Sequence, residues 1–477
     1  MSSFNFVHHY KCFQYNGSMS HLYTSRQQLI DLLKPTYGHA FKEFDVNNRL
    51  AHPNNKGVLG QIVEEGIFHY PINSNPKADF DNLGLELKTA GVKKNKKFND
   101  ISAKERLPLD AINFNTVINS DFEHSDVWQK SKGLLLVLYE FLEKVFKGDF
   151  KIINSIIHDF DKNDMLLFEQ DYDVIVDKIK RGLAHTLSGS DTLYLEACTA
   201  GQNKNDKTSQ PFSPIMARRR KFAIKASYIT AIIRSHLSKT EREHIVNQSE
   251  LKTNTFEDIV INKIEHYKGR RVDALCNRFG LDSSSKSYLE RLTAKMLGIE
   301  GSINKSDEFQ KANIELKTIR VNKDGSITES MSFPAFEFTK IVEQEWEDSD
   351  FRDLIEQKKF LFVIFKNDGD GFVLRKAMFW SAPLDDLDTK GKAVFDKLKT
   401  VLTNGEIVRG FRQQKNKTVR LTNFPGMKFN GFIHIRPHGQ DSNDTYPLPV
   451  ADKLTGATSY TKQCFWFNNS YIEKVIK

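Results

Sequence analysis

The sequence predicts an α/β or α+β protein made of two tandem copies of one fold. Three observations lead to this expectation: the length of the chain, the mixture of helix-like and strand-like segments, and an internal repeat. A chain of 477 residues is too long for one ordinary core and favours two or more domains. Its composition, with 39% hydrophobic and 27% charged residues, is typical of a folded globular chain.

The first predicted element is a helix in TSRQQLIDLLK (24–34). Ser25 and Gln28 have the spacing of a capping box, in which each side chain bonds the backbone of the other. The apolar positions fall on one helical face: Leu29, Leu32 and Leu33. A second helix is expected in KGVLGQIVEEGIF (56–68).

Strands are expected next in GLELKTAGV (84–92) and SKGLLLVLYEF (131–141), the second of them buried. A further helix is predicted in DYDVIVDKIKRG (171–182), with an apolar face made by Val174, Ile175 and Ile179. This mixture of strands and helices in the first half predicts an α/β or α+β fold.

The same segments recur in the second half, in the same order. LGLELKTAGV is followed 229 residues later by ANIELKTIRV, which pairs Glu86 with Glu315. KGLLLVLYEF returns as KKFLFVIFKN, and FAIKASYITAII returns as FWFNNSYIEKVI. Three ordered matches at offsets of about 226 to 243 predict a duplicated fold rather than a short-period solenoid. We expect one domain at residues 1–240 and another at 241–477, with the boundary in the polar segment 238–255.

The formal net charge of +8 indicates an anionic partner. Basic residues cluster in KKNKK (93–97) and RRRK (218–221), and such runs suit a polyanion. A solvated lysine-rich face is the alternative explanation when charge is the only observation.

Cysteine usage and hydropathy exclude several classes of protein. The four cysteines have no paired spacing, which argues against a zinc knuckle, a redox motif or a disulfide framework. The longest apolar run, GLLLVLY from Gly133, is far shorter than the roughly 20 residues of a membrane span. The N-terminus also lacks the apolar segment of a signal peptide. We therefore expect an intracellular protein with no membrane partner.

The stretch ADFDNLGLELKT (78–89) contains the strongest candidate site. On a strand, Glu86 and Lys88 share one face. Asp79 precedes Glu86 by seven residues, so the two carboxylates are candidate ligands of a hard divalent cation, completed by waters and phosphate. Lys88 would then orient the attacking water, contact the scissile phosphate or act as a base. An amphipathic strand with solvated charges is the alternative.

A further carboxylate is expected from the predicted helix upstream. Glu64 lies fifteen residues before Asp79 and would complete an acidic cluster. Glu65 is the competing candidate, and an ordinary exposed helix carboxylate is the alternative for both.

KGVLGQIVEE followed by ADFDNLGLELKT resembles the PD-(D/E)xK nucleases of the MutH type, which cut DNA at GATC with Mg²⁺. The resemblance implies that Glu64, Asp79, Glu86 and Lys88 are catalytic, with Asp79 and Glu86 as metal ligands and Mn²⁺ as a substitute ion. The proline of the PD signature is displaced, because Pro76 precedes Asp79 by three residues.

The resemblance extends over nearly the whole chain, through SAKERLPLDAINF, AHTLSGSDTLYLEACTAGQN and ESMSFPAFEF. These segments are similar to the staphylococcal type of restriction endonuclease that cuts GATC and contains two MutH-like domains. It implies a mixed central sheet flanked by helices in each domain, cleavage 5′ of G, and a cognate DNA methyltransferase in a prokaryotic cytoplasm. We expect a monomer that forms a dimer or loop on double-stranded DNA, with two sites bound.

The second copy is expected to be degenerate. Aligning DEFQKANIELKT on ADFDNLGLELKT puts Glu308 at Asp79, Glu315 at Glu86 and Lys317 at Lys88. Glutamate at the first position weakens the site without abolishing it. The fifteen-residue offset that places Glu64 lands on Thr293, with no carboxylate in RLTAKML. By the resemblance this domain binds a second DNA site and stimulates cleavage, and a purely structural domain is the alternative.

DNA contacts are expected from basic and amide side chains. Lys104 and Arg106 are candidates for phosphate contacts near the scissile bond, although a surface ion pair with Glu105 is equally open. By the resemblance, a loop approaches the major groove, and it contains Lys204, Lys207, Gln210, Arg218 and Arg219, with Lys225 and Tyr228 placed similarly. An exposed loop residue without any contact is the alternative for each.

The leading hypothesis is thus a type II site-specific deoxyribonuclease. A DNA-binding protein with a vestigial nuclease site is one alternative, and an intact first set of residues beside an altered second set counts against it. A methylation-sensing nickase of the mismatch-repair type is another, and the duplicated architecture counts against that.

Overall fold

The computed structural model describes residues 23–52, 55–72, 77–95, 100–201, 206–238, 242–414 and 417–477. It divides into two compact units, which are described separately below. The first consists of Met1–Glu105 and Glu123–Phe160, and the second of Arg106–Phe122 and Asp161–Lys477. Residues 161–238 thus group with the second unit by their contacts. The domain boundary near residue 240 follows the sequence repeat and stays a prediction.

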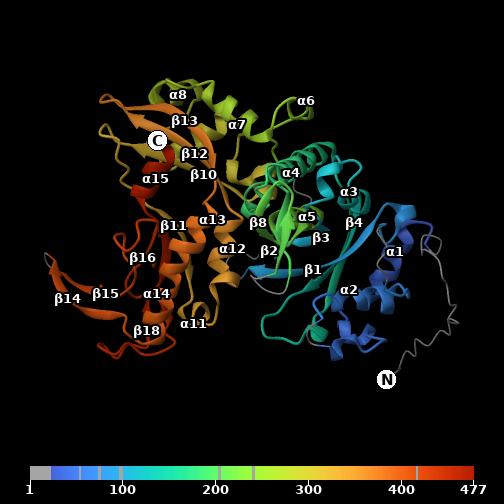
Figure 1. The fold of residues 1–477 in the computed structure, drawn as a ribbon. Helices are drawn as coiled ribbons and strands as arrows, with labels where there is room; N and C mark the ends of the chain where they lie inside the picture. Colours follow the sequence, from blue (N-terminus) through green and yellow to red (C-terminus); the bar gives the residue numbers. More distant parts are fainter. Residues whose placement is uncertain are drawn as a thin grey trace. The chain divides into compact units, whose positions relative to one another are not determined.

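A four-stranded mixed sheet forms the centre of the first unit, in the order β2-β1-β4-β5 (Figure 1). β1 and β4 run parallel, with Glu86 opposite Leu134, whereas β2 and β5 pair antiparallel with their neighbours. Its regular elements are α1 (Arg26–Leu33), α2 (Val58–Ile62), a π-helical turn (Val63–Ile67), β1 (Glu86–Asn95), β2 (Asp100–Ala103), α3 (Asp126–Lys130), β4 (Gly133–Glu140) and β5 (Ile152–Asp159). The predicted strands at 84–92 and 131–141 are confirmed.

The predicted helix at 24–34 is confirmed as α1, and its capping box is present. The Gln28 N–H donates to Ser25 Oγ at 3.4 Å, and the Ser25 N–H donates to Gln28 Oε1 at 3.2 Å. Leu29 and Leu33 are fully buried, but Leu32 is 38% exposed. The apolar face is therefore narrower than its spacing predicted, because only one side of this short helix meets the core.

β4 crosses the core of the first unit. Its residues from Gly133 to Tyr139 are all buried, which is expected of a strand that is covered on both faces. Leu135 and Val137 pack in one cluster with Ile62 of α2 and Leu85 before β1. The buried apolar run thus holds the helix and the Glu86 strand in a common core.

The second unit contains the remaining helices and strands. In its first part these are β3 (Leu107–Ile112), α4 (Lys162–Lys180), β6 (Leu195–Thr199), β7 (Lys207–Gln210), β8 (Ser213–Arg218), β9 (Arg220–Ile224) and α5 (Ala226–Ser238). Helices α6 (Gln248–Leu251), α7 (Phe256–Glu265), α8 (Val272–Phe279), α9 (Tyr288–Met296) and α10 (Asp307–Ala312) follow. The predicted helix at 171–182 is confirmed within α4, where Ile175 and Ile179 are buried but Val174 is 41% exposed.

The chain then continues through β10 (Ile314–Val321), β11 (Met331–Phe336), α11 (Phe338–Ile341), α12 (Asp350–Glu356), β12 (Lys359–Asn367), β13 (Phe372–Trp380), α13 (Leu384–Asp386), a π-helical turn (Leu387–Gly391) and α14 (Lys392–Thr403). The last elements are β14 (Val408–Gln414), β15 (Lys417–Thr422), β16 (Ile433–Pro437), β17 (Thr445–Pro447), β18 (Ser459–Thr461), β19 (Gln463–Phe467) and α15 (Asn469–Ile476). Three three-stranded sheets result, ordered β3-β9-β6, β10-β12-β13 and β11-β19-β16. Three hairpins, β7-β8, β14-β15 and β17-β18, complete the described strands.

Sheet topology repeats in the two halves of the chain, as the sequence repeat predicted. β10 and β12 pair in parallel with Glu315 opposite Phe360, and an antiparallel strand follows β12, as β5 follows β4. The sheets β3-β9-β6 and β11-β19-β16 share one pattern, in which the central strand leads directly into a helix. In those helices Tyr228 donates to Asp164 Oδ2 and Tyr471 to Asp386 Oδ2, each at 2.6 Å.

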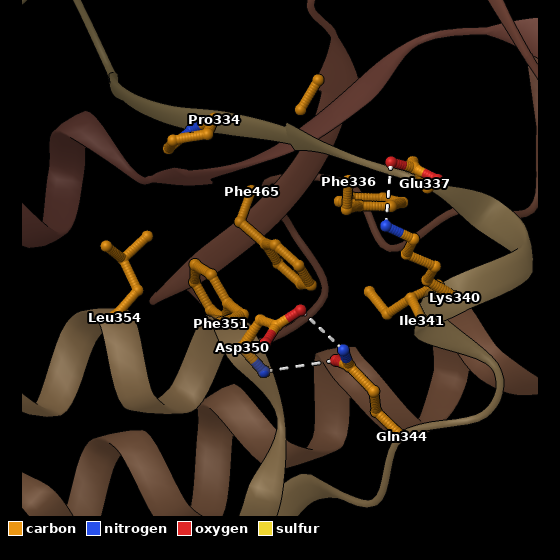
Figure 2. A pocket seen from close by; sticks show the side chains of 11 residues that line it. Pro334, Phe336, Glu337, Lys340, Ile341, Gln344, Asp350, Phe351, Leu354 and Phe465 are labelled. Carbon is orange, nitrogen blue, oxygen red and sulfur yellow. Dashed lines mark hydrogen bonds and ion pairs between the residues drawn. The ribbon is translucent and has the colours of Figure 1, made fainter. Parts of the chain in front are cut away.

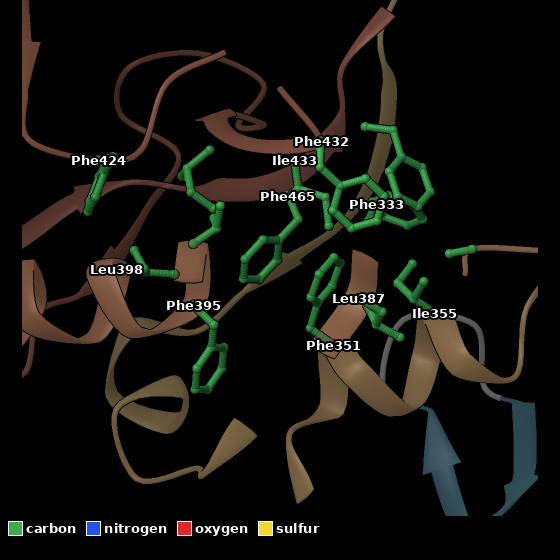
Figure 3. Packing of buried hydrophobic residues seen from close by; sticks show 14 of the residues in the cluster. Phe333, Phe351, Ile355, Leu387, Phe395, Leu398, Phe424, Phe432, Ile433 and Phe465 are labelled. Carbon is green, nitrogen blue, oxygen red and sulfur yellow. The ribbon is translucent and has the colours of Figure 1, made fainter. Parts of the chain in front are cut away.

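Aromatic rings fill the core of the second copy (Figure 3). Phe351 of α12 stacks on Phe465 of β19 with ring centroids 3.7 Å apart. Phe333 of β11 meets Phe351 and Phe467 edge-on, at 5.6 Å and 5.0 Å. Such pairs contribute about 0.5–1.5 kcal/mol each beyond their buried area. This packing joins α12 to the β11-β19-β16 sheet.

Three of the four cysteines lie in the described residues. Cys198, Cys276 and Cys464 are free and buried, while Cys12 lies outside the described residues. Within the described part of the chain, no helix has both the length and the apolar character needed to cross a membrane.

The repeated tyrosine–aspartate bond leads to a stability prediction. Tyr228→Phe and Tyr471→Phe should each lower the free energy of unfolding by about 1.5–3 kcal/mol, since each removes a hydrogen bond to a charged carboxylate. Tyr446→Phe should change little, because the Tyr446 hydroxyl bonds no described residue. Melting temperatures measured by calorimetry test this, and an equal fall in all three variants would contradict it.

Candidate active site

Asp79 and Glu86 are held together across a tight turn that leads into β1. A 3₁₀ turn (Asp81–Leu83) and Gly84, with φ of +66°, carry the chain from one carboxylate to the other. Asp79 Oδ2 accepts the Leu87 N–H at 2.9 Å, and the Asp79 N–H donates to Glu86 Oε2 at 3.3 Å. The backbone thus fixes both carboxylates at the first residues of the strand.

Glu86 is 2% exposed and is bound by two lysines. Lys88 Nζ lies 2.7 Å from Glu86 Oε1, and Lys130 Nζ at the end of α3 lies 3.5 Å from the same oxygen. The sequence did not reveal Lys130, although its place just before the buried strand was a signal. Because β4 runs parallel to β1, the segment before β4 must lie beside the start of β1.

Glu64, not Glu65, joins this cluster. Both residues belong to the π-helical turn that continues α2. Burial raises the pKa of Glu64 to about 7, helped by the charges of Asp79 and Glu86 and opposed by Lys88. Glu65 instead pairs with Arg49 at 2.6 and 2.9 Å, and that guanidinium lowers the pKa of its carboxyl group.

Repulsion between acidic groups is visible at two more residues. Burial raises the pKa of Asp79, and the nearby Glu86 charge raises it further. Tyr70 is 2% exposed, and its hydroxyl has no hydrogen-bond partner among the described residues. Burial, together with Asp79, Glu64 and Glu86, raises the pKa of this phenol above its ordinary value. The cluster therefore has excess negative charge, and the unsatisfied Tyr70 hydroxyl is close enough to feel it.

These residues fit a divalent cation. No group of three or more His, Cys, Asp or Glu side chains in the described ranges has the geometry of a metal cage. Mg²⁺ does not need one, because it usually binds one or two carboxylates, waters and substrate phosphate. Asp79 and Glu86 provide such a pair, and a bound cation would offset the Glu86 repulsion that adds to burial in raising the Asp79 pKa.

In the second copy, Glu315 and Lys317 lie together, whereas Glu308 has other partners. Glu315 Oε1 lies 2.6 Å from Lys317 Nζ, which reproduces the Glu86–Lys88 pair. Glu308 is buried and accepts the backbone N–H of Ile245 at 3.1 Å and that of Val246 at 3.4 Å. The carboxylate of Glu308 is therefore used to hold the chain that leads into α6.

Lys104 and Arg106, the candidates for phosphate contacts, lie in different units. Lys104 Nζ stands 4.6 Å from the centre of the Phe141 ring and 3.5 Å from Glu105. Arg106 pairs with Asp353 at 2.6 Å and with the fully buried Glu196 at 3.3 Å. The alternative for both residues was a surface ion pair with Glu105. Lys104 makes that pair, whereas Arg106 pairs with other carboxylates.

The predicted DNA loop forms the β7-β8 hairpin of the second unit. Lys207 is exposed at its start, and Arg218 is half-buried at its end. Arg219 is exposed and pairs with Asp206 at 2.8 Å. Gln210 is buried, accepts the Ala184 N–H at 2.7 Å and donates to the Ile215 carbonyl. Lys204 and Pro76 lie outside the described residues.

Lys225 and Tyr228 follow this hairpin in the sequence and are fully buried. Lys225 Nζ donates to the Thr192 carbonyl at 2.6 Å, and burial lowers the pKa of its ammonium. Tyr228 bonds Asp164, as described above. Both side chains are therefore part of the packed interior of the second unit.

A pocket of about 210 Å³ in the second unit has a different character (Figure 2). Aromatic and aliphatic side chains line it, and its polar groups bond one another. Gln344 donates to Asp350 Oδ2 at 2.7 Å, and Lys340 pairs with Glu337 at 3.3 Å. It contains no counterpart of the Asp79–Glu86–Lys88 set, so the acidic cluster at the start of β1 is the candidate active site.

Comparisons with known proteins place the chain in a family. The family model described as the DNA mismatch repair enzyme MutH matches residues 68–171 and again residues 297–380. The first match includes Asp79, Glu86 and Lys88, and the second includes Glu315 and Lys317. The chain is 31% identical over 488 aligned residues to the type II restriction enzyme Sau3AI of Staphylococcus aureus, covering 95% of this chain and 99% of that protein.

The opposite surroundings of Glu64 and Glu65 predict opposite effects of substitution. The raised pKa of Glu64 means that the folded state keeps its proton between about pH 4.5 and 7, while the unfolded chain releases it. This contribution to stability is therefore lost as the pH rises through 7. Glu64→Gln should raise the melting temperature of the metal-free protein at pH 8 and change it little at pH 5.

Glu65→Gln is the matched control, because it removes the ion pair with Arg49. The lowered pKa of Glu65 keeps the pair ionised at both pH values, so this variant should melt at a lower temperature at pH 5 and at pH 8. Thermal melts in EDTA test both expectations. A destabilised Glu64→Gln at pH 8 would contradict the assignment.

Proposed function

We propose that this chain, which belongs to the MutH-like family of nucleases and is a type II restriction endonuclease, hydrolyses double-stranded DNA at GATC with Mg²⁺. The observation that supports this most directly is the cluster at the start of β1, in which the buried Glu86 meets Lys88 and Asp79 bonds the Leu87 N–H, with Glu64 adjoining. Cleavage 5′ of G is expected from the resemblance, and Mn²⁺ should substitute for Mg²⁺.

Asp79 and Glu86 are proposed to hold the divalent cation. Asp79 Oδ2 is used by the Leu87 N–H, which leaves Oδ1 without a bond to any described residue. When bound, the cation would supply Lewis acidity at the scissile phosphate and lower the pKa of the attacking water. The buried position of Glu86 keeps bulk water from competing for its carboxylate.

Lys88 would contact the phosphate or the attacking water, and Glu64 would accept a proton. The ammonium of Lys88 sits at the edge of the Glu86 carboxylate, where it can donate to a phosphate oxygen or orient the water. Glu64, with a pKa of about 7, is suited to accept a proton near neutral pH. Lys130 offers a second ammonium beside Glu86 and so a further phosphate contact.

DNA binding is proposed for both halves of the chain. Lys207, Arg218 and Arg219 on the β7-β8 hairpin are the candidates for contacts in the major groove, with Lys104 near the scissile phosphate. Gln210, Lys225 and Tyr228 are bonded inside the protein, so we propose that they act by supporting this hairpin. Arg106 would reach phosphate only by releasing Asp353.

The domain from residue 241 is proposed to bind a second DNA site and stimulate the first. One active site cuts one strand, so cleavage of both strands requires a DNA-induced dimer or loop, or successive nicks. We place the enzyme in a prokaryotic cytoplasm beside a cognate DNA methyltransferase. The MutH description of the family model keeps a mismatch-repair nickase as a second candidate, but the full-length similarity to a restriction enzyme favours double-strand cleavage.

Asp79→Asn should lower the rate of plasmid cleavage by about 10²- to 10³-fold or more, because a neutral amide replaces a cation ligand. Binding of a GATC duplex in EDTA should remain, since the substitution does not alter the DNA-binding hairpin. Glu65→Gln, whose carboxylate faces Arg49, is the control and should cut normally. Undiminished cleavage by Asp79→Asn would overturn the catalytic assignment.

A plasmid with two GATC sites should be cut faster per site than a plasmid with one, by about tenfold or more, because the second site binds intramolecularly. A short GATC duplex added in trans should accelerate cleavage of the one-site plasmid. A duplex of scrambled sequence is the control. Equal rates on both plasmids would remove the case for an effector domain.

A further inference from the structure

The start of β10 in the second copy reproduces the start of β1 closely. Glu315 Oε1 lies 2.6 Å from Lys317 Nζ, and Glu315 Oε2 lies 3.3 Å from Lys358 Nζ. The corresponding distances from Glu86 are 2.7 Å to Lys88 and 3.5 Å to Lys130. One glutamate thus meets one lysine of its own strand and one from the segment before the parallel neighbour in both copies.

The counterpart of Asp79 can be identified by the backbone group that it binds. Asp79 Oδ2 accepts the N–H of Leu87, the residue after Glu86, at 2.9 Å. In the second copy the residue after Glu315 is Leu316, and its N–H donates to Asn304 Oδ1 at 3.0 Å. By this bond the position of Asp79 is occupied by Asn304.

Glu308, which the ungapped alignment puts at this position, is displaced by an insertion. Seven residues separate Asp79 from Glu86, but eleven separate Asn304 from Glu315. The additional residues form helix α10, where the first copy has only the 3₁₀ turn Asp81–Leu83. Glu308 belongs to α10, and its carboxylate accepts the backbone bonds of Ile245 and Val246 instead.

The same geometry identifies a carboxylate that corresponds to Glu64. Glu290 lies fourteen residues before Asn304, on helix α9, and Asn304 Nδ2 lies 3.4 Å from Glu290 Oε1. Helix α9 contacts β10 as helix α2 contacts β1. Thr293, the position reached by the fifteen-residue offset, is fully buried and bonds the Leu289 carbonyl. The second cluster therefore has Glu290, Asn304, Glu315 and Lys317.

The Asn304 amide has a hydrogen-bond donor where the Asp79 carboxylate has a second oxygen. Asp79 offers Oδ1 as a free anionic ligand once Oδ2 has accepted the strand N–H. In Asn304 the oxygen takes that N–H, so the remaining atom is Nδ2, a donor that turns its hydrogens toward Glu290. A hard cation needs an oxygen at this place.

We propose that Asn304 is the residue that silences the second copy: its amide nitrogen replaces the cation-binding oxygen of Asp79 in an otherwise matching cluster. The inference rests on the proposed function, since it takes Asp79 as a ligand of the catalytic cation. It also explains how the second domain could hold a DNA phosphate beside Lys317 and Lys358 without cutting.

Charge balance agrees with this. The first cluster has three carboxylates and two ammonium groups, whereas the second has two of each. Burial raises the pKa of Glu315, but Lys317 and Lys358 outweigh it and hold that pKa below its ordinary value. The pKa of Glu64 lies above its ordinary value. The second cluster is thus neutralised by its own lysines and does not need a cation.

Mn²⁺ binding to the full-length chain tests the proposal without relying on activity. Free Mn²⁺ is titrated by electron paramagnetic resonance for the wild type and for the variants Asp79→Asn, Asn304→Asp and the two combined. Asn304→Asp should gain as many bound ions as Asp79→Asn loses, and the double variant should match the wild type. Asn304→Ser, which keeps a polar side chain without a charge, is the control and should gain none.

The outcomes separate this inference from the proposed function. If Asp79→Asn loses an ion but Asn304→Asp gains none, the role of Asn304 is overturned while the first site stands. If Asp79→Asn loses no ion, the proposed function itself fails. Thermal melts provide a second measurement: Mn²⁺ should raise the melting temperature of the double variant and leave that of Asp79→Asn/Asn304→Ser unchanged.

Discussion

The parallel pairing of β1 with β4 is the constraint on which the active site depends. It sets Glu86 opposite Leu134, at the point where both strands begin. The segment before β4 then brings Lys130 to Glu86, and the turn before β1 brings Asp79 to the Leu87 N–H. Leu87 of β1 packs in the core of the first unit, whereas Lys88 on the opposite face is only half-buried, so a slip of β1 by one residue would exchange these two faces.

Burial then determines the electrostatics of the pocket. Three carboxylates lie close together, with Glu86 buried and Glu64 and Asp79 half-buried, and two lysines do not balance them. The pKa values of Glu64 and Asp79 are raised as a result of burial and of this unbalanced negative charge. The same strand pairing in the second copy carries two carboxylates and two lysines, and there the pKa of Glu315 is lowered. The same strand arrangement thus carries a cluster with excess negative charge in the first copy and a cluster with balanced charge in the second.

Much of the fold could be predicted from local sequence. The capping box of α1, the strand around Glu86, the buried strand after Lys132 and the duplication all depend on residue spacing within short segments. The narrower apolar faces were not predictable, as the exposure of Leu32 and Val174 shows. Which side chains on a helix face meet the core depends on the elements that pack against it, and spacing does not contain that information.

The sequence by itself determined the motif of the first site, since Asp79, Glu86 and Lys88 lie within ten residues of one another, and a strand places two of them on one face. Only the tertiary structure distinguished Glu64 from Glu65 and added Lys130 and Tyr70, because these depend on how separate segments meet. It also shows that in the second copy the strand N–H, which Asp79 accepts in the first, is accepted by Asn304 and not by Glu308, the basis of our proposal for Asn304. An inserted helix changes the sequence spacing, whereas a hydrogen bond to the strand N–H follows the position of the side chain in space.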